Sequence, residues 1–285
     1  MFPDPDFLKS IAAVSSLHAR GTAWYEESET LMKSQVERIH HEFSSEPICL
    51  GEIGEFFFPF FSMGQIDSRA LFGLDEIILF SFYYTNRNKY RKVLDLGANI
   101  GLHTLIMKKL GFDVVSYEPD ETHAHQMIQT LMLNELTTEG IRQKAVSDSS
   151  GELNFQRVLN NTTGSHLLGS KDSVYGPTDV VTVQSDDISQ VLSVESFDLI
   201  KMDVEGHEAI LLAKLSKELI EKTDIMLEIG STINAERIFI ILKEKGIPAY
   251  SQKINWKQVT IVDDLPSHHS HGSVFLSLQA PPNWN

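Results

Sequence analysis

The chain has 285 residues, 42% of them hydrophobic, which is enough to bury one substantial core and leave material for an appended region. Its 39 acidic residues outnumber the 24 basic ones and give a formal net charge of −15 at pH 7, which disfavours nucleic acid as a partner because such a surface repels phosphates. Cys49 is the only cysteine, so an intrachain disulfide is excluded and a reducing compartment is expected.

The sequence shows no sign of secretion or of a membrane span. The first ten residues, MFPDPDFLKS, lack the basic start and the apolar run of a secretory signal. A run of about 18 apolar residues is absent, and FFFPFF is both too short and interrupted by Pro59. We therefore expect a soluble, cytoplasmic protein.

Residues 1–90 differ in pattern from the rest of the chain. A polar segment from Thr22 to Phe43 is predicted to be helical, and the segment LFGLDEIILFSFYY is apolar nearly all round, so we expect a buried helix there. We predict that residues 1–90 form an accessory layer on a main domain of residues 91–285. The aromatic run Phe56–Phe61 is interpreted as core or interface packing, with a cover over a ligand site as the alternative.

After this layer, short apolar strands alternate with amphipathic helices. In chain order the predicted strands are 92–97, 113–120, 141–148, 197–203, 223–230, a segment around Tyr250 and 273–278. The predicted helices are 102–110, 121–134, 207–219 and 236–246. Residues 151–158 and 179–184 are predicted to form a hairpin-like excursion. Asp120 is expected to cap the second helix, and Gly246 is expected to end the last one. This alternation indicates an α/β fold with a mainly parallel sheet, helices on both faces, and ligands at the carboxyl ends of the strands.

The motif VLDLGANIG joins the first of these strands to a helix through a glycine turn. Gly97 and Gly101 permit a tight turn and close approach of a ligand, and the following helix offers unpaired backbone N–H groups. The spacing is not the Gly-x-Gly-x-x-Gly of dinucleotide sites, and a Gly-Lys-Ser/Thr phosphate loop is absent, so a nicotinamide oxidoreductase and a nucleoside triphosphatase are disfavoured. The turn suits the zwitterionic tail of an amino acid, with Asp95 near the ammonium group and turn amides near the carboxylate. A sharp turn without a ligand is the alternative.

Two acidic residues end the next two strands. Glu118 follows Asp95 at about the spacing at which a carboxylate accepts hydrogen bonds from ribose hydroxyls in this class of fold. Together with the glycine turn, Glu118 indicates a nucleoside site. Asp148 is then placed to meet the adenine edge, with a turn-forming aspartate as an equal alternative.

The motifs VLDLGANIGLHTL, VSYEPD, AVSDSSGE and IKMDVEGHE together resemble the FkbM family of S-adenosylmethionine-dependent methyltransferases, over about residues 92–278. The resemblance implies a class I methyltransferase fold, which is a Rossmann-like αβα sandwich, with S-adenosylmethionine as the methyl donor. It also implies a hydroxyl acceptor, often on a sugar or a secondary metabolite. By motif, Glu118 looks like the ribose ligand, and the donor loop looks like Asp95, Gly97, Asn99 and Gly101.

The motif IKMDVEGHE, residues 200–208, is expected to form the acceptor side of the site. Transfer of a methyl group to a hydroxyl requires alignment of the two groups and a base or a metal ion that removes the hydroxyl proton. Strand alternation places Lys201 and Asp203 on one face, which makes Asp203 a candidate partner for a buried lysine.

Three interpretations of this motif remain open. In the first, His207 or Asp203 removes the proton and Glu205 positions the hydroxyl. In the second, Asp203, Glu205 and Glu228 hold a divalent metal ion such as magnesium. In the third, Glu205 and Glu208 stabilise the start of the helix and Asp203 ties down the turn. We adopt the first and predict no metal site, with the divalent metal ion as an alternative.

We therefore predict an S-adenosylmethionine-dependent O-methyltransferase that acts on a hydroxyl of a sugar, glycan or secondary metabolite. The alternatives are a non-hydroxyl acceptor and a protein of the same fold that binds the donor without turnover. The histidines of SHHSHGS, His268, His269 and His271, are interpreted as a polar loop and not as zinc ligands. The acceptor pocket is expected to combine the N-terminal layer with residues 149–178, and the oligomeric state does not follow from the sequence.

Overall fold

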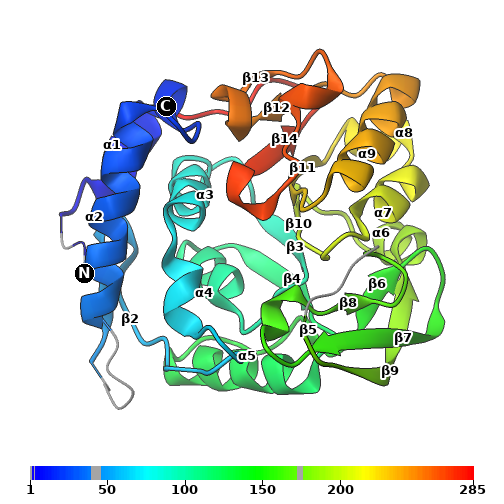
Figure 1. Cartoon of the computed structure of the whole chain (residues 1–285), viewed down its shortest axis with the longest axis horizontal. Coiled ribbons are helices and arrows are strands. Elements are labelled where there is room, and N and C mark those ends of the chain that lie inside the picture. The colour runs from blue at the N-terminus through cyan, green and yellow to red at the C-terminus, as the bar shows by residue number, and fades with distance from the viewer. Residues whose placement is uncertain (1, 3, 40–45, 172–175) are drawn as a thin grey trace.

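In a computed structural model, which describes residues 2, 4–39, 46–171 and 176–285, an eight-stranded sheet forms the centre of the molecule (Figure 1). In sheet order its strands are β13 (Lys257–Gln258), β12 (Ala249–Ser251), β14 (Ser273–Leu276), β11 (Asp224–Glu228), β10 (Leu199–Met202), β3 (Lys92–Leu96), β4 (Asp113–Tyr117) and β5 (Ile141–Arg142). The strands from β11 to β5 are parallel, whereas β14 runs antiparallel to both of its neighbours. The predicted α/β fold with a mainly parallel sheet is confirmed.

The strand order reverses between β3 and β10. From β3 the chain moves outward through β4 to β5, then returns to pair β10 with the other side of β3 and continues to β11. Such a reversal leaves a crevice outside the carboxyl ends of the two central strands, because their connections lead away in opposite directions. The motifs VLDLGANIG and IKMDVEGHE occupy those two ends.

Two hydrophobic clusters lie on the two faces of this sheet, and helices cover both. Alternation along β3 sends Val93 into one cluster and Leu94 with Leu96 into the other. The first cluster includes side chains of α4 (Leu102–Lys109) and α5 (Glu121–Leu133), and the second includes side chains of α6 (Ile188–Val194), α7 (Glu208–Lys214) and α9 (Thr232–Lys245).

Asp120 caps α5 as predicted, because its Oδ1 accepts hydrogen bonds from the backbone N–H groups of Thr122 and His123. Gly246 ends α9 in the left-handed conformation, also as predicted.

Two of the predicted elements are wrong in their extent. The strand predicted over 141–148 is divided between β5 of the central sheet and β6 (Ala145–Ser147) of a second sheet, because β6 pairs with β9 and not with β4. The helix predicted over 207–219 ends at Lys214, and a separate helix, α8 (Lys217–Ile220), begins after a new cap at Ser216.

The second sheet has four strands in the order β6, β9 (Thr178–Asp187), β7 (Gly151–Val158) and β8 (His166–Leu167). Its long antiparallel pair, β7 with β9, confirms the predicted hairpin-like excursion. Below, "the excursion" means residues 149–178, of which 172–175 lie outside the described residues.

The N-terminal layer, residues 1–90, contains α1 (Phe7–Ala13), α2 (Ala23–Ile39), β1 (Ile48–Leu50), β2 (Gly54–Phe56) and α3 (Leu74–Thr85). The part of the predicted helix beyond residue 39 lies outside the described residues. Figure 1 shows α1 and α2 along one side of the molecule, with α3 between them and the sheet. As predicted, α3 is buried along almost its whole length, and Ile77 and Phe82 join the same cluster as Val93 of the sheet. Burial of each such side chain stabilises the fold by about 1.5–3 kcal/mol.

Short 3-10 helices connect these elements: Ser15–Leu17, Gly51–Ile53, Ser68–Phe72, Thr162–Gly164, Gln252–Ile254, Val262–Asp264 and His269–His271. Among the described residues, none of the helices is both long and apolar enough to cross a bilayer.

Candidate active site

A cavity of about 780 Å³ lies at the carboxyl ends of the central strands. Its floor includes the ends of β3, β4, β10 and β11, which contribute Gly97, Glu118, Asp203 and Glu228. One wall comes from the N-terminal layer and another from the excursion, as the sequence predicts. The wall residues from these two segments include Ile66, Ala70, Leu71, Glu76, Phe155, Asn161, Thr162, Gly164, Ser165, His166, Leu167 and Lys171.

The structure brings five of the nine predicted site residues onto this cavity: Gly97, Asn99, Glu118, Asp203 and Glu205. The other four, Asp95, Gly101, Asp148 and His207, are not among the described residues that line it.

Residues 97–101, for which the sequence predicts donor binding, are called the donor loop below, and their two glycines allow close packing of protein against protein. Gly97 has φ 76°, and a Cβ there would lie 1.8 Å from the backbone oxygen of Asp203. Gly101 has φ 88°, and a Cβ there would lie 2.5 Å from Cγ of Met127 on α5. Glycine is therefore required at both positions because the loop touches the end of β10 and the helix α5.

The backbone N–H groups of the donor loop are engaged within the protein. Those of Gly97 and Ala98 both donate to the Tyr117 carbonyl, and that of Gly101 donates to the Ala98 carbonyl. Those of Asn99 and Ile100 donate to side-chain oxygens, at 2.8 Å each. From the sequence we expect turn amides to meet the donor's carboxylate. In this structure the amides of Gly97, Ala98 and Asn99 bond the end of β4, and the other two bond atoms of the loop itself.

Asp95 is fully buried beneath the loop and pairs with a buried lysine. Its Oδ2 accepts a hydrogen bond from Thr104 Oγ1 at 2.7 Å, and its Oδ1 lies 3.6 Å from Nζ of Lys201, the residue opposite it on β10. The Lys201 ammonium group also lies 3.5 Å from Asp203 Oδ2 and 3.4 Å from the Gly97 carbonyl oxygen. Burial opposes the charge on Lys201, but the carboxylates of Asp203 and Asp95 outweigh burial and raise its pKa. Lys201 therefore stays charged and links the donor loop to the end of β10.

Glu118, which directly follows β4, bonds the backbone of the donor loop. Its Oε2 accepts from the backbone N–H of Asn99 and its Oε1 from that of Asp120, both at 2.8 Å. Burial raises the pKa of Glu118 to about 8, although these hydrogen bonds favour the charged form. Each carboxylate oxygen keeps a second lone pair, so Glu118 can still accept hydrogen bonds from a ligand in the cavity.

The turn after β10 is held by Glu208 and by the excursion. The buried Glu208 carboxylate accepts from the backbone N–H groups of Val204 and Gly206, and burial raises its pKa to about 7. Glu205 adopts φ 54° and forms an ion pair with Lys171 of the excursion. Glu208 thus has the structural role that the third interpretation gives it, whereas Glu205 lines the cavity.

His207 lies beside the cavity with both ring nitrogens engaged. Its Nε2 is 2.9 Å from Ser147 Oγ, and its Nδ1 is 3.0 Å from Ser170 Oγ. Burial lowers its pKa, so the ring is neutral at pH 7. Asp148, next to Ser147, is exposed and accepts a hydrogen bond from Ser147 Oγ at 3.3 Å. His207 and Asp148 therefore lie where β6, the start of α7 and the excursion meet.

Acidic side chains dominate the cavity near β10 and β11. Burial raises the pKa of Glu228 well above its usual value, and the negative charges of Asp203 and Glu76 raise it further. Glu76, from α3, has its Oε2 within hydrogen-bond distance of His103 Nε2, at 2.7 Å. Over the described part of the chain, no three or more His, Cys, Asp or Glu side chains are grouped so that they could hold a metal ion.

Sequence reasoning missed several cavity residues that lie outside the recognised motifs. Glu76 begins a helix and resembles an ordinary first-turn acid, while His166 and Lys171 lie in irregular sequence. A local pattern could not have identified them, because only the tertiary fold brings these segments to the end of β10.

The strand order, the reversed strand β14 and the cavity at the switch point define a class I methyltransferase fold. A model of the methyltransferase FkbM domain matches residues 95–251, which is more than half of the chain. The chain therefore belongs to the FkbM family of S-adenosylmethionine-dependent methyltransferases.

A curated relative is the hexuronic acid methyltransferase AglP of Haloferax volcanii, which is 25% identical over 161 residues. The match covers 56% of this chain and 65% of the relative, so the chain spans slightly less than two thirds of the relative's length. Similar solved structures include a SAM-dependent methyltransferase from Agrobacterium tumefaciens, with a TM-score of 0.42 and 13% identity over 82% of this chain and 70% of that one. An O-methyltransferase from Bacillus cereus has a TM-score of 0.36 and 12% identity, over 69% of this chain and 78% of that one.

Proposed function

We propose that this protein transfers a methyl group from S-adenosylmethionine to a hydroxyl of a sugar, a glycan or a secondary metabolite. The observation that carries the proposal is that one cavity joins the donor loop and Glu118 to the acidic end of β10. Its volume of about 780 Å³ falls in the range of about 300–1,000 Å³ that is usual for small-molecule sites. A donor and part of an acceptor can therefore lie side by side in it.

The chemistry of the wall suits the donor. Glu118 offers carboxylate lone pairs to a ribose, and Tyr117, Ala145 and Val146 provide an apolar surface for an adenine ring. Asp203 and Glu228 supply negative charge where a sulfonium would be stabilised. When bound, the donor supplies an electrophilic methyl group, and the residues of the chain have to align the acceptor and remove its proton.

A sugar is the favoured acceptor because the curated relative is named for a hexuronic acid. The N-terminal layer and the excursion contribute the walls of the cavity that an acceptor would meet. The family match begins at residue 95, so it does not include the N-terminal layer. We propose that the N-terminal layer serves as the acceptor-side wall of the enzyme, so the acceptor need not be the one that the relative uses.

Two measurements test this function. Isothermal titration calorimetry should detect binding of S-adenosylhomocysteine and should detect none of NAD. Mass spectrometry should then show the gain of one methyl group by at least one compound in a panel of hydroxyl acceptors that includes glucose, N-acetylglucosamine, glucuronic acid and their methyl glycosides.

The outcomes separate the alternatives. Binding of S-adenosylhomocysteine without any methylated product would favour a donor-binding protein without turnover, and a product methylated on nitrogen would favour a non-hydroxyl acceptor. Loss of activity with a chelator, restored by magnesium, would assign Asp203, Glu205 and Glu228 to a metal ion.

A further inference from the structure

His166 is a buried histidine on the cavity wall with one ring nitrogen free. It lies in β8, where backbone pairing with Gln156 of β7 fixes its position, and only 1% of its surface is exposed. It shares the cavity with the donor loop and Asp203. A buried polar atom usually has a hydrogen-bond partner, because desolvation without one costs free energy. Nε2 of His166 has none among the described residues.

The other ring nitrogen determines which tautomer is present. Nδ1 lies 2.9 Å from the backbone oxygen of Gly164, and a carbonyl can only accept, so Nδ1 carries the hydrogen. Burial lowers the pKa of His166, and the positive charge of Lys171 lowers it further, while the Gly164 carbonyl raises it. The ring is therefore neutral at pH 7, and its Nε2 carries a lone pair.

A short network connects this ring to the turn after β10. The Gly164 carbonyl also accepts a hydrogen bond from Lys171 Nζ at 3.4 Å, and the same ammonium group forms the ion pair with Glu205. Gly164, Lys171 and Glu205 all line the cavity. The orientation of His166 is thus fixed relative to the acidic end of the site.

We propose that His166 is the general base of methyl transfer and that its Nε2 accepts the proton of the acceptor hydroxyl. The inference rests on the proposed O-methyltransferase function. As the O–H bond breaks, its proton moves to Nε2 and the oxygen forms a bond to the methyl carbon. The C–S bond of S-adenosylmethionine breaks, and its electron pair stays on sulfur. A sulfonium cation and a neutral imidazole become a thioether and an imidazolium, so the total charge is unchanged.

Two other buried histidines of this region have ring nitrogens engaged by hydroxyl groups, whereas His268 and His269, which also line the cavity, are exposed. Both ring nitrogens of His207 are engaged by serine hydroxyls. Nε2 of His123, another buried histidine of the wall, is bonded to Thr162 Oγ1 at 2.9 Å. Nε2 of His166 is buried in this structure, so part of the wall has to move for the acceptor to reach it. Catalytic hydrogen bonds commonly form only in the reacting complex.

The test is the variant His166→Asn. Asparagine keeps an amide donor near the position of Nδ1, so it can preserve the bond to Gly164 while it removes Nε2. With the hydroxyl compound that the wild type methylates, we expect kcat to fall by about 100-fold or more. Affinity for S-adenosylhomocysteine and the melting temperature should stay close to those of the wild type. The decline of kcat/KM at acidic pH, which reports protonation of the base, should disappear in the variant.

Two further variants provide a rescue experiment and a control. His166→Ala should regain part of its rate when imidazole is added, because the free base can occupy the space of the missing ring. His125→Gln is the matched control, since His125 is exposed on α5 away from the cavity, and its kinetics should equal those of the wild type.

Turnover at the wild-type rate in His166→Asn would overturn the assignment of the base and leave the proposed function intact. Joint loss of turnover and of S-adenosylhomocysteine binding would also overturn the assignment, because it would show a structural role. A wild type that binds S-adenosylhomocysteine but methylates no compound of the panel would overturn the proposed function, and the base role with it.

Discussion

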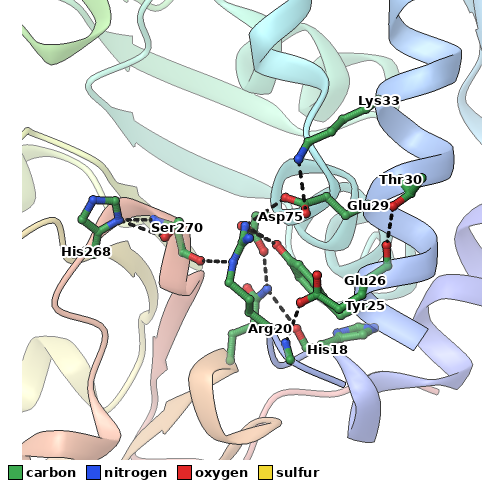
Figure 2. A network of polar contacts seen from close by, with 12 residues as sticks. His18, Arg20, Tyr25, Glu26, Glu29, Thr30, Lys33, Asp75, His268 and Ser270 are labelled. Carbon is green, nitrogen blue, oxygen red and sulfur yellow. Dashed lines mark hydrogen bonds and ion pairs between the residues drawn. The ribbon is translucent and has the colours of Figure 1, made fainter. Parts of the chain in front are cut away.

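Arg20 forms a hydrogen bond to the backbone of Ser270, in a loop that lines the cavity at His268 and His269. The Arg20 Nε donates a hydrogen bond to the Ser270 carbonyl oxygen at 2.8 Å, although the two residues lie at opposite ends of the chain (Figure 2). Ser270 stands between His269, which lines the cavity, and His271. The guanidinium group is held in turn by Tyr25 and Glu29 of α2, so the N-terminal layer supports this loop.

Replacement of Arg20 by alanine should loosen the loop. The lost contact is half exposed, so we expect a cost of about 1 kcal/mol and a rise of about fivefold in the KM of the acceptor, with little change in kcat. Hydrogen exchange of the amides of residues 268–271, followed by mass spectrometry, should be faster. Lys33→Ala is the matched control, because it removes another ion pair of Glu29, at 3.3 Å, without touching the loop. Unchanged exchange in Arg20→Ala would contradict the role of this contact.

Glu118→Ala should weaken donor binding. The substitution removes a carboxyl group that faces the cavity and also releases the backbone N–H groups of Asn99 and Asp120. Because each hydrogen bond contributes about 0.5–1.5 kcal/mol and more than one is lost, affinity for S-adenosylhomocysteine should fall by about 10-fold or more. Calorimetry measures the change, with Glu121→Ala, an exposed acid at the start of α5, as the control. Equal affinity in Glu118→Ala and the control would exclude Glu118 as a donor ligand.

Asp203→Asn should leave calorimetric binding of S-adenosylhomocysteine, which has no sulfonium charge, close to that of the wild type and should depress turnover. The Asp203 backbone packs against Gly97, so this packing is kept when the side chain is changed. The side chain faces the cavity and helps to neutralise Lys201 at 3.5 Å. We expect kcat to fall by about 10-fold or more, since a charge near the reacting groups is lost. Wild-type turnover in this variant would show that the Asp203 carboxylate has no part in the chemistry.

The contribution of His18 to the stability of the fold should fall as the pH drops below about 6.5. Burial lowers the pKa of His18 to about 4, although its hydrogen bond to the Ile11 carbonyl opposes this shift. The other ring nitrogen accepts a hydrogen bond from Trp256 in the core. The unfolded chain binds a proton near pH 6.5 and the folded one only near pH 4, so protonation favours unfolding between these values. The loss from this residue should approach about 1.4 kcal/mol per pH unit within that window.

Urea unfolding of the wild type and of His18→Gln at pH 7 and pH 5 measures this contribution. Glutamine can both donate and accept, so the variant should fold. The difference in the free energy of unfolding between the wild type and His18→Gln should change from pH 7 to pH 5 in the direction that disfavours the wild type. The exposed His125→Gln should show the same pH dependence as the wild type. If His18→Gln also shows the wild-type pH dependence, His18 makes no pH-dependent contribution to stability.

Much of the fold follows from local patterns in the sequence. The caps at Asp120 and Gly246 and the apolar strands at Val93 and Ile200 are encoded within a few residues, and the structure confirms them. The strand over 141–148 is predicted wrongly because its division depends on which distant strand pairs with Ala145. Pairing partners are a long-range property that alternation alone does not reveal.

The site is predicted less completely than the fold, for the same reason. Motif spacing places Glu118 and Asp203 at the strand ends, and both line the cavity. It cannot show that His207 packs between two serines, or that Glu76 and His166 reach the cavity from outside the motifs. These placements are set by how the N-terminal layer and the excursion fold over the sheet.

The contact between Gly97 and the backbone of Asp203 has a consequence for how new specificities can arise. A Cβ at Gly97 would meet the Asp203 backbone oxygen, so the loop after β3 and the end of β10 are packed at a fixed spacing. If these segments bind the donor and the acceptor as we propose, a residue larger than glycine there would force them apart and misalign the methyl group, whatever the acceptor. Variation in substrate choice is therefore confined to the segments that surround the joint, and exchange of the excursion or the N-terminal layer between related enzymes is the practical route to redesign.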